Sequence, residues 1–353
     1  MNKASRLTTR GVLWLGIAFL LAAAWREIGP AFSPGSILQQ ALNSDLIVYW
    51  AANRLWLKGA NPYQTKSLCE IYAALGAAAQ SADFCSWHRL WYPPPWSLPL
   101  LSLFLRPTFL LAGYVWIGLS FICLALIFTT ARSAGGAPWP RHLALFALSL
   151  LLSMHAIGTQ VQRFQLGFLQ ALAVLGLFCS MHNKRYLPAG LWCAVLAIKP
   201  HLFLLPGCLW LWQRLREKCC RPSVACLSAP AAASLIAVAF TAQIFSHWLE
   251  SLNEPPLFQQ SSDLAGLLRK ISIDLLRTDP RWLTLVVPHI GVLISWLWLS
   301  RRKAPIDWRY HGPCLALWSL FIAPYSHVHD HVIILPASLL LLAYQAAGRQ
   351  KTT

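Results

Sequence analysis

The sequence predicts an all-α fold, a polytopic bundle of transmembrane helices, and three features of its composition support this class. Hydrophobic residues make up 57% of the 353 residues. Charged residues make up only 12%, whereas a soluble domain carries roughly 25%. The 18 tryptophans are a third signal, because tryptophan favours membrane–water interfaces. This composition excludes an ordinary soluble protein and a disordered chain.

The net charge of +17 has two explanations, a nucleic-acid partner or membrane topology, and the positions of the charges favour topology. Basic residues gather between the apolar runs, as the bias toward Lys and Arg in cytoplasmic loops predicts. With these clusters inside, every acidic residue except Glu217 and Asp307 falls on the outer side. We therefore expect a multi-pass protein with a cytoplasmic N-terminus, membrane lipids as partners and no nucleic acid. The clusters are Lys3/Arg6/Arg10, Arg132/Arg141, Lys184/Arg185, Arg214/Arg216/Lys218/Arg221, Arg301/Arg302/Lys303/Arg309 and Arg349/Lys351.

A series of apolar runs predicts the membrane segments in order. A spanning helix needs about 20 residues, so the shorter runs must be tilted, broken or only partly membranous. The run 11–28 lacks a small-x-small cleavage site, and we interpret it as a retained first helix. Residues 94–106 either dip in from outside or form one short span, which gives about nine to eleven segments. The runs are 11–28, 108–130, 142–158, 166–181, 187–213, 223–246, 282–300, 313–323 and 332–347.

The whole chain, 1–353, is expected to be a single integral membrane domain with long outer loops at 29–93 and 247–281. The first loop contains Cys69 and Cys85, which on the outer side are either a disulfide or two free thiols. No Walker loop, GxGxxG, GxSxG or HExxH motif occurs. The sequence therefore gives no support to nucleotide chemistry carried by a known loop.

The first outer loop is expected to contain a helix over about 46–57. Ser44 or Asp45 can cap its start, and Gly59 fits its end. Its apolar side chains predict amphipathic character and a position along the outer membrane face. Asp45 has two open roles: an N-cap, or a carboxylate that takes a proton from a hydroxyl substrate. The apolar positions are Leu46, Tyr49, Trp50, Trp56 and Leu57.

Arg163 and Lys199 are basic where the charge pattern predicts no cation. Arg163 is either an interfacial arginine or a phosphate clamp, for which the planar guanidinium is suited. Lys199 precedes Pro200, which must break the apolar run 187–213. A lysine at such a break either snorkels to the interface or, as we favour, binds a phosphate or another part of a substrate.

Residues 327–331 bring three histidines and Asp330 together between the last two apolar runs. A zinc site is one interpretation, but histidines at alternate positions do not converge neatly in a helix or turn. Hydrogen bonding to a sugar or phosphate is the favoured interpretation, and a simple polar loop is the third. We expect no cofactor and assign no metal ligand.

Six short motifs follow one another along the chain. They are Asp45…Tyr49-x-Ala51-Ala52, Gly59-x-Asn61-Pro62-Tyr63, Tyr92-Pro93-Pro94, Gln165, Lys199-Pro200 and Pro324-x-Ser326-x-x-His329. This ordered set resembles glycosyltransferase family 87, which includes polyprenyl-phosphate-mannose-dependent mannosyltransferases. The resemblance extends over residues 11–347 and implies a GT-C fold in the inner cell membrane, with the active site on the non-cytoplasmic face. The family often has Gly-Gln where this chain has Phe164-Gln165.

The resemblance also implies residue roles. An aspartate in the first outer loop is the expected general base, which is Asp45 here. Lys199, His327 and His329 are implied to line the donor site. The implied reaction moves a mannose-like hexose or a pentose from a polyprenyl-phosphate donor to a hydroxyl of a lipid or glycan acceptor, with inversion. Further substrate-binding candidates are Tyr49, Tyr63, Tyr92, Arg163 and Gln165.

This chemistry is physically consistent. The leaving group is a phosphate, already stable as an anion, so cations such as Lys199 and Arg163 can replace a strong general acid. Asp45 then deprotonates the acceptor hydroxyl, with Asp330 as the rival base. The alternative function is a polytopic lipid or solute transporter with a midplane site at Lys199-Pro200. No internal repeat is evident in the sequence, which favours the enzyme.

Overall fold

The computed structural model describes residues 36–76, 93–135, 139–200, 204–217, 221–251, 263–302, 306–323 and 326–348. Every regular element within these ranges is a helix, which confirms the predicted all-α class. The expected first helix at 11–28 lies outside the described residues. So do Tyr92 and Cys85.

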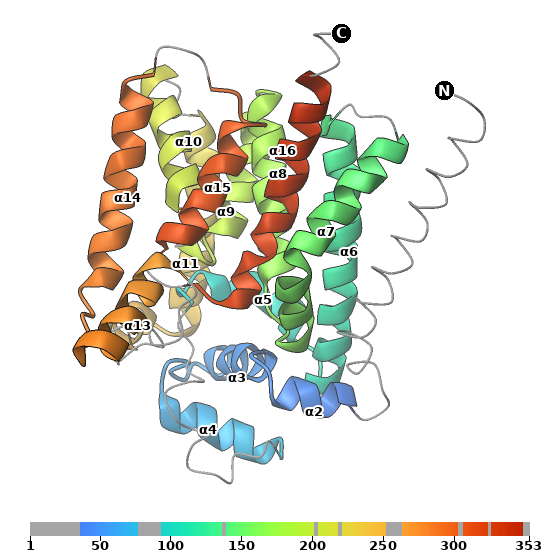
Figure 1. Ribbon diagram of the computed structural model, residues 1–353. Coiled ribbons are helices and arrows are strands. Elements are labelled where there is room, and N and C mark those ends of the chain that lie inside the picture. The colour runs from blue at the N-terminus through green and yellow to red at the C-terminus, as the bar shows by residue number, and fades with distance from the viewer. Residues whose placement is uncertain are drawn as a thin grey trace.

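The upper part of the molecule is a helical bundle (Figure 1). Five of its helices each contain most of one predicted apolar run: α6 (Phe109–Gly135), α7 (Trp139–Gln162), α8 (Gly167–His182), α14 (Leu283–Ser300) and α16 (Ile334–Gly348). The bundle is completed by α9 (Tyr186–Leu196), α10 (Leu204–Glu217), α11 (Arg221–Phe240) and α15 (His311–Ile322).

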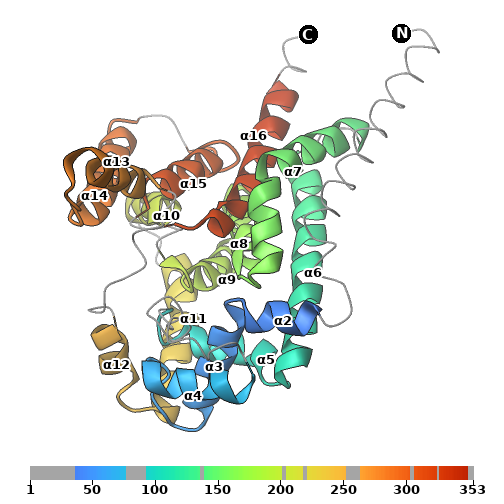
Figure 2. The same cartoon turned by 60° about the horizontal axis from the view of Figure 1, so that its bottom comes forward.

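A second layer lies across the lower end of this bundle (Figures 1 and 2). It contains α2 (Ser36–Leu42), α3 (Leu46–Leu57), α4 (Thr65–Ala74) and α5 (Ser97–Leu105), and α3 packs on both α4 and α5. Of the two alternatives for 94–106, a segment that dips in from outside or a short span, the nine-residue α5 does not fit the span. A helix of that length is only about 14 Å long, too short to cross a hydrocarbon core of about 30 Å.

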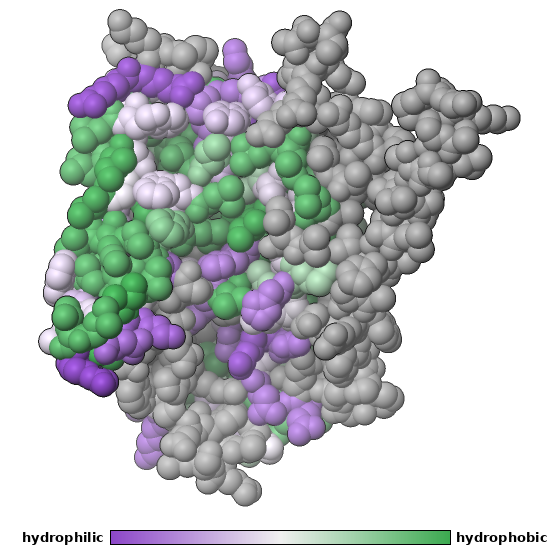
Figure 3. Space-filling view, in the orientation of Figure 1, coloured by the Kyte–Doolittle hydropathy of each residue, from purple (hydrophilic) through white to green (hydrophobic). Residues whose placement is uncertain are grey.

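Two described helices are long and apolar enough to cross a membrane, Phe109–Ala131 of α6 and Leu283–Ser300 of α14. Leu227–Phe240 of α11 and α12 (Ile244–Ser251) make a third segment if the pair, bent by 102°, is one span. Hydrophobic side chains cover the middle of the face that carries α14 and α15, and hydrophilic side chains gather toward its two ends (Figure 3). The chain is therefore a helical membrane protein, while the expected nine to eleven segments are not confirmed and stay a prediction.

The helix predicted at 46–57 is present as α3, but the expected amphipathic character is wrong, and its position along the outer membrane face stays a prediction. Its buried residues lie on all sides of the helix; they are Leu46, Ile47, Val48, Tyr49, Ala51, Ala52, Asn53, Leu55 and Trp56. Its surroundings explain why, since neighbours in the lower layer and in the bundle cover most of it. Gly59 ends the helix as predicted, with φ +72° and its N–H donated to the Trp56 carbonyl at 2.9 Å.

The turn between α7 and α8 joins the two hydrophobic cores of the protein. Phe164 and Leu166 belong to the core around α3, whereas Phe168 belongs to the core of the bundle. Leu169 packs against both. Polar side chains at this turn are therefore held between two packed regions, which is a rigid position for a site.

Candidate functional site

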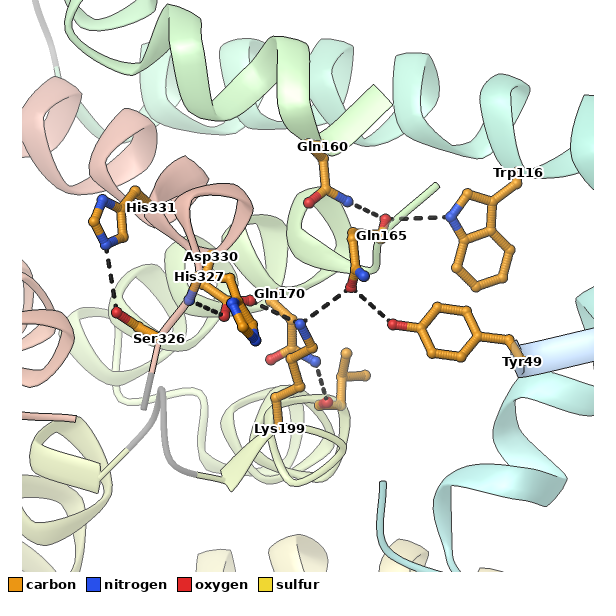
Figure 4. A network of polar contacts seen from close by, with 11 residues as sticks. Tyr49, Trp116, Gln160, Gln165, Gln170, Lys199, Ser326, His327, Asp330 and His331 are labelled. Carbon is orange, nitrogen blue, oxygen red and sulfur yellow. Dashed lines mark hydrogen bonds and ion pairs between the residues drawn. The ribbon is translucent and has the colours of Figure 1, made fainter. Parts of the chain in front are cut away.

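The site is built around the turn 163–166, where α7 stops and α8 has not yet begun. Phe164 adopts φ +51°, in the left-handed region that favours glycine. The side-chain amide of Gln160 donates to the Gln165 carbonyl, and Trp116 Nε1 donates to the same oxygen at 3.2 Å (Figure 4). Two side chains thus satisfy one backbone oxygen of the turn, which lies outside both helices.

The positive φ gives a physical meaning to the departure from Gly-Gln at this position. A glycine before Gln165 would adopt the left-handed backbone without steric cost, whereas Phe164 bears a cost of about 1–2 kcal/mol. Phe164 is only 2% exposed and packs in the lower core. Burial of a phenylalanine side chain is worth about 1.5–3 kcal/mol, enough to offset that strain. Phe164 can therefore hold the left-handed backbone directly before Gln165.

The side chain of Gln165 connects segments that lie far apart in the sequence. Its Oε1 accepts a hydrogen bond from the Tyr49 hydroxyl at 2.8 Å and one from Lys199 Nζ at 3.3 Å (Figure 4). Gln165 itself is buried. Three of the candidate substrate-binding residues, predicted separately from three segments, therefore meet at one amide oxygen.

Lys199 lies at the helix break that Pro200 predicts, after α9 has ended at Leu196. The last carbonyls of α9 accept hydrogen bonds from neighbouring elements. Gln170 Nε2 donates to Val195 O at 3.0 Å, and Trp96 Nε1 donates to Ala197 O at 3.0 Å. Broken backbone inside a membrane protein is tolerated only where its polar groups are satisfied in this way.

Asp330 is the ionic partner of Lys199. Its Oδ1 lies 2.7 Å from Lys199 Nζ, and the two side chains are 1% and 13% exposed, respectively. Its Oδ2 accepts the backbone N–H of His327 at 3.1 Å, which completes a capping box at the start of η5 (Val328–Ile333). Both carboxylate oxygens are thus engaged inside the protein. This engagement makes Asp330 less suited than Asp45 to act as the base, and its role as the rival base stays a prediction.

Asp45 lies beside the same turn. Its backbone N–H donates to the Arg163 carbonyl at 3.2 Å. Its side chain makes no capping hydrogen bond to α3, and Ser44 Oγ accepts the Leu46 N–H at 3.2 Å instead. Of the two residues that could cap the helix, Ser44 therefore caps it. The half-buried Asp45 carboxylate is not used as an N-cap.

Burial and four nearby charged side chains determine the pKa of His327. Burial is the main cause that lowers its pKa below the usual value. Asp330 and Asp45 act in the opposite direction. Lys199 and Arg163 act with burial, because a nearby cation disfavours a second positive charge. The net result is a lowered pKa, so His327 is neutral at pH 7 and can donate or accept a hydrogen bond.

The remaining candidates lie less centrally or cannot be placed. The Tyr63 hydroxyl donates to Pro93 O at 2.9 Å and so holds the lower layer together. The Arg163 side chain is exposed, and the His329 side chain is outside the described part of the chain. Tyr92 also lies outside it. The other ring of the cluster, His331, has Nε2 3.5 Å from Ser326 Oγ.

Sequence reasoning missed Gln170 and Trp116 as parts of this site. A signal for Gln170 existed, because it is a polar residue inside the apolar run 166–181 and is completely buried. Such a residue must find hydrogen-bond partners, so it often marks a structural junction. Trp116 had no comparable signal, since a tryptophan in an apolar run is ordinary.

Gly167 provides a direct test of how tightly this turn is packed. A Cβ at this position would lie 2.7 Å from Val332 Cγ1 and would collide with the Gln160 amide oxygen. We therefore expect Gly167→Ala to destabilise the protein by about 1–3 kcal/mol and to lower any activity of the site. Gly118→Ala is the matched control, since a Cβ at this α6 position meets nothing within 4 Å. Thermal unfolding of both variants checks this, and equal stability of the two would contradict the packing argument.

No group of three or more His, Cys, Asp or Glu side chains arranged for a metal ion occurs among the residues that the structure describes. The fold and the site together define a helical membrane protein whose polar centre lies at the ends of interrupted helices. The model of glycosyltransferase family 87 matches residues 90–324, more than half of the chain. The chain belongs to glycosyltransferase family 87 and is a membrane glycosyltransferase. No curated protein and no solved structure was found to match it.

The matched range bears on the site unevenly. It includes Arg163, Gln165 and Lys199, whereas Asp45 precedes it and Asp330 follows it. The geometry of the site is therefore the evidence that connects these two residues to the matched part of the chain.

Proposed function

We propose that this protein transfers a mannose-like hexose or a pentose from a polyprenyl-phosphate donor to a hydroxyl acceptor, with inversion, at the outer face of the membrane. Asp45 is the general base, and Lys199 binds the donor phosphate. Tyr49, Gln165 and His327 complete the donor side. The acceptor is a lipid or a glycan, and the whole chain acts as one membrane domain of a GT-C type enzyme in the inner cell membrane.

The observation that carries this proposal is the convergence at the turn 163–166. The segment of Asp45 is hydrogen-bonded to the backbone of this turn, and Lys199 is hydrogen-bonded to the Gln165 side chain. A residue that bears a carboxylate and a residue that bears an ammonium group thus come to one turn from two distant segments of the chain. Transfer from a phosphate-linked donor requires this combination, a base for the acceptor and a cation for the leaving group.

The reaction is balanced with these groups alone. The acceptor oxygen forms a bond to the anomeric carbon while the bond from that carbon to the phosphate oxygen breaks. The acceptor proton passes to the Asp45 carboxylate. The departing phosphate gains negative charge, which the Lys199 ammonium stabilises. One carboxylate is sufficient because the phosphate leaving group needs no protonation. In a glycosidase, by contrast, the leaving-group oxygen becomes a hydroxyl and must be protonated.

Cys69 supports the placement of this site on the outer face. It is disulfide-bonded and lies in α4, in the layer beneath the bundle that also contains α3. Disulfides persist in oxidising compartments. The positive-inside rule independently places the opposite end of the bundle, with Arg301 and Arg302, in the cytoplasm. Both arguments support the proposal that the lower end in Figure 1 faces the outside.

An apolar surface beside the turn is where the polyprenyl chain would dock in this proposal. Trp116, Phe164 and Phe168 are among its residues, and the hollow between them is only about 20 Å³, so the lipid would lie along this surface and not inside a preformed cavity. Phe164 directly precedes Gln165, so a lipid chain on this surface would bring its phosphate toward Gln165 and Lys199.

The decisive experiment is a transfer assay with purified protein in lipid nanodiscs. Polyprenyl-phosphate hexoses and pentoses serve as donors with a panel of lipid and glycan acceptors, and nucleotide sugars serve as the control donors. We expect transfer from lipid-phosphate donors only, with inverted anomeric configuration by NMR. Lipid or solute flux into proteoliposomes without any transfer would instead support the transporter.

A further inference from the structure

We propose that Asp330 is a specificity-determining residue: it neutralises Lys199 so that the site accepts a donor with a single phosphate charge and rejects a diphosphate. This inference rests on the proposed function and deepens it. It assigns to Asp330 a role that is neither the general base nor a simple structural one.

The geometry shows how Asp330 can act without touching the substrate. Its Oδ1 is 2.7 Å from the Lys199 ammonium, and its Oδ2 is occupied by the His327 N–H. The side chain is only 1% exposed, so it is held behind Lys199 rather than in front of it. A phosphate that contacts the ammonium group therefore also experiences the negative charge directly behind it.

The charges around the site are balanced in number. Four charged side chains act electrostatically on His327, the acidic pair Asp330 and Asp45 and the basic pair Lys199 and Arg163. Formally these cancel, and His327 itself adds no charge when neutral. A phosphodiester brings one negative charge to this region, whereas a diphosphate brings at least two. The other cation among the described groups that act on His327 is Arg163, whose side chain is exposed and whose charge Asp45 matches in number.

The expected consequence is large because the region is largely buried. Like charges a few ångströms apart interact strongly where the effective dielectric constant is low. Removal of the Asp330 charge should therefore improve binding of a diphosphate relative to a monophosphate diester by about tenfold or more.

The test compares two competitors that share one prenyl chain, so that only the headgroup charge differs. One is a polyprenyl phosphate methyl ester, a monoanion, and the other is the polyprenyl diphosphate. Inhibition of transfer by each is measured in nanodiscs for the wild type and for Asp330→Asn. We expect the wild type to prefer the methyl ester and Asp330→Asn to shift this preference toward the diphosphate by about tenfold or more.

Matched variants separate charge from structure. Asp330→Glu keeps the charge and should keep the wild-type preference. Asp279→Asn removes a carboxylate paired with Arg269 and Arg281, away from Lys199, and should also leave it unchanged. If Asp330→Asn alone does not fold, the double variant Lys199→Met/Asp330→Asn replaces it, because neither member of its pair is charged. Direct binding of the two lipids to this double variant is then compared with their binding to Lys199→Met. Adding Asp330→Asn to Lys199→Met should give the same tenfold shift.

The inference is overturned if Asp330→Asn weakens both competitors equally or if the ratio does not follow the charge. In that case Asp330 only supports the fold. Failure of the wild type to transfer sugar from any donor would be a different result, since it would contradict the proposed function itself.

Discussion

Replacing Asp45 by asparagine is expected to lower the transfer rate by about 10²–10⁴-fold while leaving the stability of the protein almost unchanged. The rate falls because the amide cannot accept the acceptor proton. The stability is kept because the change removes no capping hydrogen bond of α3 and asparagine has nearly the same size and shape as aspartate. Initial rates and thermal unfolding of the same preparation check both parts.

Ser44→Ala is the reciprocal control for this prediction. Ser44 Oγ accepts the Leu46 N–H and donates to the Ala41 carbonyl, so its loss should reduce stability by about 0.5–2 kcal/mol. The chemical step should be spared at temperatures where the variant is folded. Wild-type transfer by Asp45→Asn would remove Asp45 from the mechanism and would require another base.

Replacing Lys199 by methionine is expected to affect stability and activity together. The change leaves Asp330 as a buried carboxylate without its cation, which typically costs about 3–5 kcal/mol. It also removes the proposed ligand of the departing phosphate. Loss of a comparable preorganised donor lowers rates by about 10²–10³-fold.

The double variant Lys199→Met/Asp330→Asn separates these two effects. With both charges removed, most of the lost stability should return, because an uncharged pair avoids the desolvation penalty of a lone buried ion. Transfer should stay low, because the cation for the phosphate is still missing. Unfolding temperature and kcat/KM of both variants provide the measurement. Recovery of transfer together with stability would show that the pair is only structural.

The sequence determined the helical class and the places where chemistry could occur. Apolar runs placed α6, α7, α8, α14 and α16 correctly, because burial against lipid or other helices requires such runs whatever the detailed packing. The end of α3 was also predicted correctly from local backbone geometry. Gly59 ends α3 because its left-handed φ is easy for glycine alone.

The charge pattern was informative in a different way. Lys199 attracted attention because a lysine beside a proline in an apolar run is expensive without a partner. That argument required a partner but could not identify it. The engagement of Asp330 could not be predicted for the same reason, since its partner Lys199 lies 131 residues away.

Only the tertiary structure decided that α3 is buried, that Ser44 rather than Asp45 caps it, and that Gln165 connects Tyr49 to Lys199. The first result depends on what surrounds a helix, which its own periodicity does not contain. The Gln165 contacts join this residue to Tyr49, 116 positions away, and to Lys199, 34 positions away. Sequence patterns report short-range geometry, whereas a site of this kind arises where the two cores meet and distant polar groups satisfy one another.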